Sequence, residues 1–296
     1  MQRLKYVRMK NFLLLFGLLS LACRETGNGK ADNNTLLWQI TGPGITKPSY
    51  LYGTIHIMCP DDIVVTDVLN DKFNSTGQLY LELDLDDPAT MTDAMKGMVM
   101  KDNTTLKDLL SKGAYDTVSA SFQKITGMPL AMINTMKPML SEALIYPAIL
   151  GCQGEAWEQK FMEMAKAKKM ELKGLETTKD QLDIFDSIPY KAQAEMLAKS
   201  LKDVDSLKIS FKQMLDIYKK KDLDSLNILI NDDPDFAGYE DIMINKRNAR
   251  WIPEIIEEGK KMPTFFAVGA GHLGGPRGVI AMLRKQGYTL TPVKYW

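Results

Sequence analysis

Six short runs rich in β-branched, aromatic and leucine residues constrain the fold of this chain more than any other feature of its sequence. Turn residues bound the runs, which lie at 36–40, 50–55, 78–83, 170–175, 264–268 and 288–293. Runs of this kind are typical of β-strands. Because most of them fall near the two ends of the chain, we predict one mixed β-sheet built from N-terminal and C-terminal strands.

The middle of the chain has a helical pattern instead. Apolar residues recur every three to four positions at 88–100, 115–125, 130–150, 155–168, 190–220 and 239–260. We therefore predict an α/β or α+β domain over 35–296, with a helical middle at about 88–168 that forms a cap or side layer. The pattern leaves the strand order open. Methionines at helical spacing, such as Met91, Met95 and Met132, are assigned to the core.

The first 23 residues differ in composition from everything that follows. Basic residues precede an apolar run at 12–22, which ends on Cys23. Such a run would make a helix of roughly 16 Å, about half of a bilayer core, so 1–22 has the form of a secretory signal peptide. Residues 19–23 also resemble a bacterial lipobox, although Ser20 departs from the usual aliphatic residue. We predict an exported, membrane-anchored lipoprotein of a bacterial cell envelope, lipidated on Cys23 with a flexible tether over 23–34; plain secretion is the alternative.

Cysteine content and charge narrow the class of protein further. If Cys23 is lipidated, Cys59 and Cys152 remain, and they either form one disulfide or stay as two isolated buried thiols. The chain carries 37 basic and 37 acidic residues. This balance gives no reason to expect a nucleic-acid partner, because phosphates favour a concentrated basic surface.

The chain has only two histidines, His56 and His272. Each follows an apolar strand and has a glycine three positions earlier, Gly53 and Gly269 respectively. A glycine at a strand end permits unusual backbone angles or a close approach by a ligand. Neutral imidazole is a common ligand for zinc, manganese, cobalt and iron, so we predict a paired metal site. The competing interpretation is two unrelated histidines bonded to backbone.

Two glutamates are placed to complete such a site, which generally needs a carboxylate. Glu82 alternates with leucines in a predicted strand, and Glu176 follows another predicted strand. Each could instead be a surface acid. Other chemistries lack their motifs, because the sequence contains no Gly-x-Ser-x-Gly elbow, no His-Glu-x-x-His and no phosphate-binding loop ending in Lys-Ser/Thr.

Five motifs in order resemble the TraB/GumN family, which includes the Tiki metalloproteases. They are Tyr-Gly-Thr-Ile-His at 52–56, Leu-Glu-Leu-Asp at 81–84, Gly-Leu-Glu-Thr at 174–177, Arg-Asn at 247–248 before Trp-Ile-Pro, and Gly-Ala-Gly-His-Leu-Gly-Gly at 269–275. The resemblance spans about 36–293. It implies a metal-dependent hydrolase fold with both Gly-x-x-His motifs at its centre.

The resemblance also implies roles for single residues. His56, His272 and Glu82 or Glu176 would hold one divalent transition metal (manganese, cobalt or zinc), with the other glutamate as general base. Arg247 would bind a substrate carboxylate or the oxyanion, or else anchor its own helix by a salt bridge.

The function that this resemblance implies is a Tiki-like peptidase acting on a peptide or protein in the cell envelope. The alternative is a non-catalytic envelope lipoprotein that binds haem or a peptide in the same two-histidine cleft, and an inactive family member is a third interpretation. Many relatives lack a cysteine near position 152, so a disulfide from Cys59 to Cys152 would be a local elaboration that pins the helical cap near the site.

Overall fold

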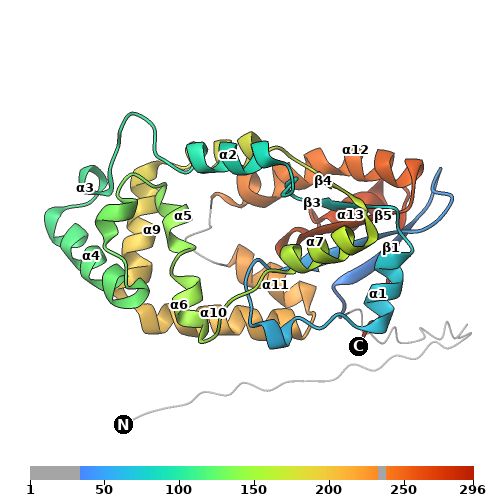
Figure 1. Ribbon diagram of the computed structural model, residues 1–296, viewed down its shortest axis with the longest axis horizontal. Helices are drawn as coiled ribbons and strands as arrows, with labels where there is room; N and C mark the ends of the chain where they lie inside the picture. Colours follow the sequence, from blue (N-terminus) through green and yellow to red (C-terminus); the bar gives the residue numbers. More distant parts are fainter. Residues whose placement is uncertain (1–33, 233–237) are drawn as a thin grey trace, which may run out of the picture. The chain divides into compact units, whose positions relative to one another are not determined.

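A computed structural model describes residues 34–232 and 238–296 of the chain. One six-stranded mixed sheet runs through it in the order β4-β3-β5-β2-β1-β6 (Figure 1). Its strands are β1 (Leu37–Thr41), β2 (Ser49–Thr54), β3 (Gln78–Leu81), β4 (Glu171–Gly174), β5 (Thr264–Gly269) and β6 (Thr289–Pro292). Each predicted strand is therefore present, and the mixed sheet flanked by helices confirms the predicted fold class.

The direction of the strands determines at which edge of the sheet the residues that follow them meet. Strand β5 lies between β3 and β2 and is parallel to both, and β4 is parallel to β3. Strands β1 and β6 pair antiparallel at the other side of the sheet. Because parallel strands end at one edge, the residues that follow β2, β3, β4 and β5 meet there.

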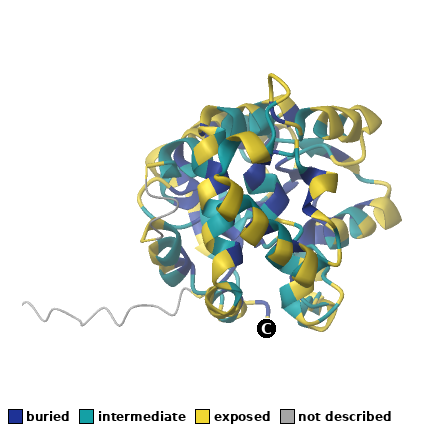
Figure 2. Cartoon of the chain, turned by 90° about the vertical axis from the view of Figure 1, so that its left-hand side faces the viewer, coloured by how far each residue is buried: buried dark blue, intermediate teal, exposed yellow. Residues whose placement is uncertain are grey.

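The central strands are buried on both faces, as in sheets covered by helices on each side. All residues of β2 and β3 are buried, and so is β5 up to its last residue. Rings of Tyr52, Phe73, Phe161 and Phe265 pack against one another with centroids 5.0 to 6.3 Å apart where the sheet meets its helices. Buried residues lie on the inner faces of the elements and exposed residues on the outer faces (Figure 2).

The helices divide between two hydrophobic cores. Helix α7 contributes Trp157 and Phe161 to the core around the sheet, whereas α4 and α9 share a second core that includes Phe122 and Leu197. We expected the helical middle to span about 88–168, but α7 at the end of that range lies on the sheet and α9 beyond it joins the second core. The α-helices are α1 (Asp67–Asn74), α2 (Pro88–Gly97), α3 (Leu106–Leu109), α4 (Lys112–Thr126), α5 (Pro138–Glu142), α6 (Tyr146–Leu150), α7 (Trp157–Lys168), α8 (Thr178–Ser187), α9 (Tyr190–Lys202), α10 (Val204–Lys219), α11 (Leu223–Asn231), α12 (Lys246–Lys261) and α13 (Val279–Lys285).

A capping residue breaks one helix that we predicted as continuous, and prolines divide another. The predicted helix at 190–220 ends at Lys202, because Asp203 leaves helical geometry and its carboxylate caps the next helix through Ser206. The predicted helix at 130–150 becomes a 3-10 turn and two short helices, and prolines occupy the first turn of both helices.

The assignment of the methionines to the core is wrong for three of them. Met91, Met95 and Met132 are exposed, because helix α2 buries no residue and Met132 lies on the outer side of a 3-10 turn. Helical spacing alone therefore did not separate a buried face from an exposed one.

A buried ion pair joins the elements of the second core to α8. Nζ of Lys137, whose side chain is 2% exposed, lies 2.7 Å from a carboxylate oxygen of Asp186. Burial raises the pKa of Asp186, but hydrogen bonds from Lys137, Tyr190 and Lys101 outweigh it and lower the pKa to about 2.

The N-terminal predictions concern residues that the structure does not describe. The predicted signal peptide at 1–22, the lipidation site Cys23 and all but the last residue of the predicted tether lie outside the described residues. Within 34–232 and 238–296, each helix is too short or too polar to cross a bilayer.

Candidate active site

The shared edge of the parallel strands brings the sequence motifs together. Glu82 directly follows β3, Glu176 lies two residues after β4, and His56 lies two residues after β2. His272 ends a 3-10 turn that continues directly from β5. These side chains converge because four strands end side by side, as the topological argument predicted.

Gly269 forms the floor of the site. A Cβ atom on this residue would lie 3.2 Å from Glu82 Oε1, 3.6 Å from His272 Cδ2 and 3.9 Å from His56 Nε2. Its φ of −50° is open to any residue, so the position needs glycine for space rather than for an unusual backbone angle. The other motif glycine, Gly53, also serves a close approach, with its Cβ position 3.1 Å from the backbone Cα of Ala270.

Arg247, from α12, is the hub of the site. Its Nε donates to both oxygens of Glu176 at 3.1 and 3.2 Å, and its Nη2 donates to Glu82 and Glu176 at 2.5 Å each. Its Nη1 donates to the carbonyl of Met243 at 3.1 Å and lies 3.0 Å from His272 Nε2. The guanidinium thus joins residues 71 and 165 positions away, and these salt bridges anchor α12, as one of the two predicted roles of Arg247 requires.

Both partners of this ion pair are buried, and their charges stabilise each other. Burial raises the pKa of Glu82, but the charge of Arg247 outweighs it and holds the pKa well below its usual range. A backbone hydrogen bond from Gly269, 2.8 Å long, acts in the same direction. The carboxylates in turn raise the pKa of Arg247 despite its burial. Glu82 is therefore ionised and fixed in place.

Glu176 is less accessible than its predicted catalytic role requires. Its side chain is 2% exposed, and its oxygens accept hydrogen bonds from Arg247 and from Trp251 Nε1 at 3.3 Å. A carboxylate held in this way orients Arg247 and has little freedom to take a proton from water.

His272 is buried and neutral. Burial lowers its pKa to about 3, against an opposing effect of Glu82. Its Nδ1 lies 2.7 Å from Asn248 Oδ1, so Nδ1 carries the proton and Nε2 presents its lone pair to Arg247. The Trp251 ring lies against the imidazole with centroids 4.5 Å apart.

His56 sits in a different environment. Its Nδ1 lies 3.0 Å from Glu158 Oε1, and the same oxygen accepts a 2.5 Å hydrogen bond from Thr54 Oγ1. Desolvation lowers the pKa of His56, but the hydrogen bond and charge of Glu158 outweigh it and raise the pKa to about 9. Because 70% of the side-chain surface is exposed, solvent screens part of this effect.

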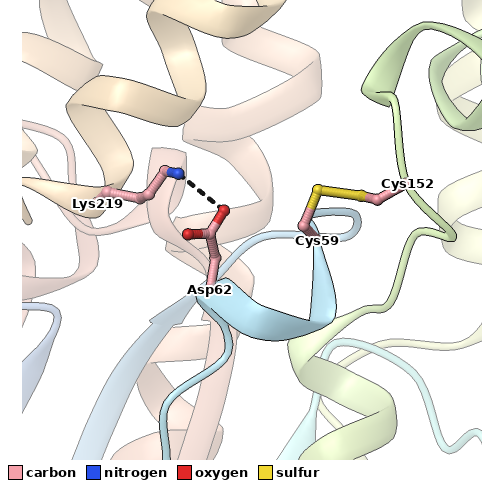
Figure 3. The surroundings of a disulfide bond; sticks show 4 residues. All are labelled: Cys59, Asp62, Cys152 and Lys219. Carbon is pink, nitrogen blue, oxygen red and sulfur yellow. Dashed lines mark hydrogen bonds and ion pairs between the residues drawn. A yellow bond between two sulfur atoms is a disulfide. The ribbon is translucent and has the colours of Figure 1, made fainter.

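The loop after His56 is fastened to the rest of the fold. Cys59 forms a disulfide with Cys152, and Figure 3 shows it joining this loop to the segment that precedes α7. Figure 3 also shows the ion pair of Asp62 with Lys219, whose atoms are 2.7 Å apart. Of the two states that the sequence left open for these cysteines, the structure has the disulfide.

The donor set suits a divalent transition metal, although the side chains do not form a closed coordination group. Each histidine has Nδ1 held by an oxygen, so Nε2 is the nitrogen that could face an ion, and in His272 this nitrogen lies 3.0 Å from Arg247 Nη1. His272 Nε2 lies 3.9 Å from Glu82 Oε1, within the roughly 4.2 Å that two atoms sharing a metal at about 2.1 Å can span. Among residues 34–232 and 238–296, no group of three or more His, Cys, Asp or Glu side chains is arranged to hold a metal ion. Arg247 contacts both His272 Nε2 and Glu82 Oε2, so its guanidinium lies between two of the candidate ligands.

A cavity of about 200 Å³ lies beside the second histidine motif. Its wall includes Gly271, which directly precedes His272, and Asn245, which lies two residues before Arg247. Asn227 and Arg277 give it carboxamide and charged groups as well. A polar ligand would therefore find hydrogen-bonding partners next to the site.

Sequence reasoning missed four residues that contact the predicted ones. Asn248 and Trp251 stand in the Arg-Asn motif, so their position gave a signal that we did not turn into a role. No sequence signal pointed to Glu158 or Gln181, because each reaches the site from a helix whose packing the sequence does not specify. Gln181 donates to Glu82 at 3.2 Å.

Comparisons with known proteins show which protein family this chain resembles over most of its length. A family model for the TraB/PrgY/gumN family matches residues 36–292. The chain is 24% identical to Metalloprotease TIKI2 of Danio rerio, covering 87% of this chain and 60% of the relative. It is also 24% identical to Metalloprotease TIKI1 of Homo sapiens, covering 88% and 62%. The chain thus spans about 60% of the length of these relatives, and no solved structure matched it.

Proposed function

Because this chain belongs to the TraB/PrgY/gumN family, we propose that it is an exported, lipid-anchored, metal-dependent hydrolase that cleaves peptides or proteins of the cell envelope. The names of its relatives support a peptidase, since they are metalloproteases. One observation carries the proposal. His56 Nε2, the His272 ring and Glu82 Oε1 all lie within 4 Å of the position that a Cβ atom on Gly269 would occupy. Both histidines also have Nδ1 held by an oxygen acceptor.

In this proposal His56, His272 and Glu82 hold a manganese, cobalt or zinc ion. When bound, such an ion polarises a carbonyl and lowers the pKa of a coordinated water toward neutrality. The neutral state of His272 and the ionised state of Glu82 are the forms that ligate metals.

Arg247 has a separate role in this proposal, which is to bind the substrate. Its Nη1 now donates toward His272 Nε2. In this proposal Nη1 would instead donate to the carbonyl oxygen of a bound peptide, where charge develops during hydrolysis. Glu176 keeps the guanidinium in place through its contacts with Nε and Nη2, and the adjoining cavity offers room for part of the substrate.

Metal content is the measurement that tests this function. Wild type, His56→Ala, His272→Ala and the exposed control Glu163→Gln are loaded with manganese, cobalt or zinc, desalted and analysed for bound metal. We expect about one metal per chain in wild type and control, and a loss in both histidine variants with unchanged circular dichroism. A peptide library then reports cleavage by the loaded wild type.

Wild type that binds no metal, or histidine variants that bind as well as wild type, would refute the proposal. Titration with haem and with peptides would then test the alternative of a ligand-binding protein in the same cleft. A haem absorbance band that disappears in His56→Ala would support that alternative.

A further inference from the structure

Glu158 contacts the candidate site although no sequence motif includes it. It lies in the first turn of α7, and the whole residue is 8% exposed. One carboxylate oxygen, Oε1, receives both the Thr54 hydroxyl at 2.5 Å and the His56 Nδ1 at 3.0 Å. Both partners come from the same segment at the end of β2, so Glu158 couples α7 to the histidine loop.

The two segments that meet at this contact are held together on both sides of it. The backbone groups of Met58 and Glu155 pair through two 2.9 Å hydrogen bonds, and the Trp157 amide donates to the carbonyl of Ile55 at 3.3 Å. The disulfide between Cys59 and Cys152 lies just beyond. The separation of Glu158 and His56 is therefore set by backbone and covalent bonds as well as by the side chains.

A stabilising role accounts poorly for a carboxylate at this position. Glu158 Oε2 is buried and has no hydrogen-bond partner in the described part of the chain. A buried polar atom without a hydrogen-bond partner is destabilising, and this cost exceeds what a charge in the first turn of a helix contributes to stability. A carboxylate kept at this position therefore needs an explanation other than stability, and the contact of Oε1 with His56 supplies one.

We infer that Glu158 is a positioning residue for His56, accepting the Nδ1 proton and fixing the tautomer and orientation of the ring. In the neutral ring Nε2 then carries no proton, and this nitrogen lies 3.9 Å from the Cβ position of Gly269, close to Glu82 and His272. Hydrogen bonding of the second ring nitrogen to a carboxylate is a general means of orienting a ligand histidine. This inference rests on the proposed function for the use of Nε2, but the contact itself exists without a metal.

The test compares wild type, Glu158→Gln and the control Glu163→Gln, which alters an exposed glutamate of the same helix. Nitrogen-15 spectra of the metal-free protein, recorded over a pH titration, report the tautomer of each ring. With only two histidines in the chain, His56→Ala assigns both rings. We expect neutral His56 to carry its proton on Nδ1 in wild type and control, and to shift toward the Nε2 tautomer in Glu158→Gln, with His272 unchanged.

Calorimetric titration with zinc provides the second measurement. Loss of an outer-shell partner typically weakens metal binding about 10- to 100-fold, which we expect for Glu158→Gln and not for the control. Wild-type His56 with the tautomer mixture of free histidine would overturn the inference, and this result needs no variant to fold. Unchanged ring signals and zinc affinity in folded Glu158→Gln would overturn it as well. If wild type binds no zinc, the proposed function fails, whereas the spectra still decide the role of Glu158.

Discussion

Replacing Arg247 with methionine tests whether its guanidinium holds the candidate site together. Methionine keeps much of the length and apolar volume of the side chain and removes every donor. The change leaves Glu82 and Glu176 as two carboxylates in one buried site, since their side chains are 10% and 2% exposed. Within residues 34–232 and 238–296, neither carboxylate has another cation at hydrogen-bond distance, and the remaining arginine contact, Arg250 with Glu176, spans 3.7 Å.

The structure sets the size of the expected effect. Removing one partner of a buried ion pair costs about 3–5 kcal/mol, because a buried charge is left unpaired. The stability of a whole domain is only about 5–15 kcal/mol, so this loss is readily measured. Arg250→Met is a matched control one turn further along α12. Its side chain is 51% exposed, so we expect a cost below about 1 kcal/mol.

Urea unfolding of both variants with a chelator present, at pH 7 and at pH 4, is the assay. The folded-state pKa of Glu82 in wild type is depressed, so the stability from the pair is present above the ordinary glutamate pKa of about 4.3 and is lost as pH falls further. Without Arg247, burial raises the pKa of Glu82, so at low pH the carboxylate of the variant is protonated and no longer leaves a buried unpaired charge. The difference between wild type and Arg247→Met should therefore be largest at pH 7 and smaller at pH 4. Equal costs for the two arginine variants, or a difference that does not change with pH, would refute the reasoning.

Three further predictions concern the floor of the site, the disulfide and the buried ion pair of α8. Gly269→Ala should weaken metal binding by about ten-fold or more, because its Cβ would lie 3.2 Å from a carboxylate oxygen. The control is Gly113→Ala, whose Cβ would meet open space on a helix. It should leave metal binding unchanged and add up to about 1 kcal/mol of stability. Replacing Cys59 and Cys152 by serine should lower the free energy of unfolding by about 2–5 kcal/mol; a urea midpoint equal to that of the oxidised wild type would contradict this. Asp186→Asn should cost about 3–5 kcal/mol at pH 7 by leaving its buried lysine partner unpaired. Since the aspartate pKa is lowered to about 2, that cost should shrink as pH falls from about 4 toward 2, and a constant cost would exclude the ion pair as its source.

The sequence alone predicted the parts of this protein that depend on local pattern. Short β-rich runs predicted the strands of the sheet, and the motif residues after four of them meet at one edge because parallel strands end together. That argument alone predicts that His56, His272, Glu82 and Glu176 lie near one another. Local pattern was less informative about helices, where an exposed methionine face on α2 has the same spacing as a buried one.

Tertiary structure decided how these residues are used. Arg247 reaches Glu82 across 165 positions, and Glu158 reaches His56 across 102, because α12 and α7 lie against the sheet edge in one particular orientation. The same packing decides that Cys59 bonds Cys152. The position of a strand along the chain follows from local pattern, whereas the side chain that a helix presents to a distant strand depends on the packing of the whole core. The candidate ligands could therefore be read from the sequence, and the residues that hold and neutralise them could be read only from the fold.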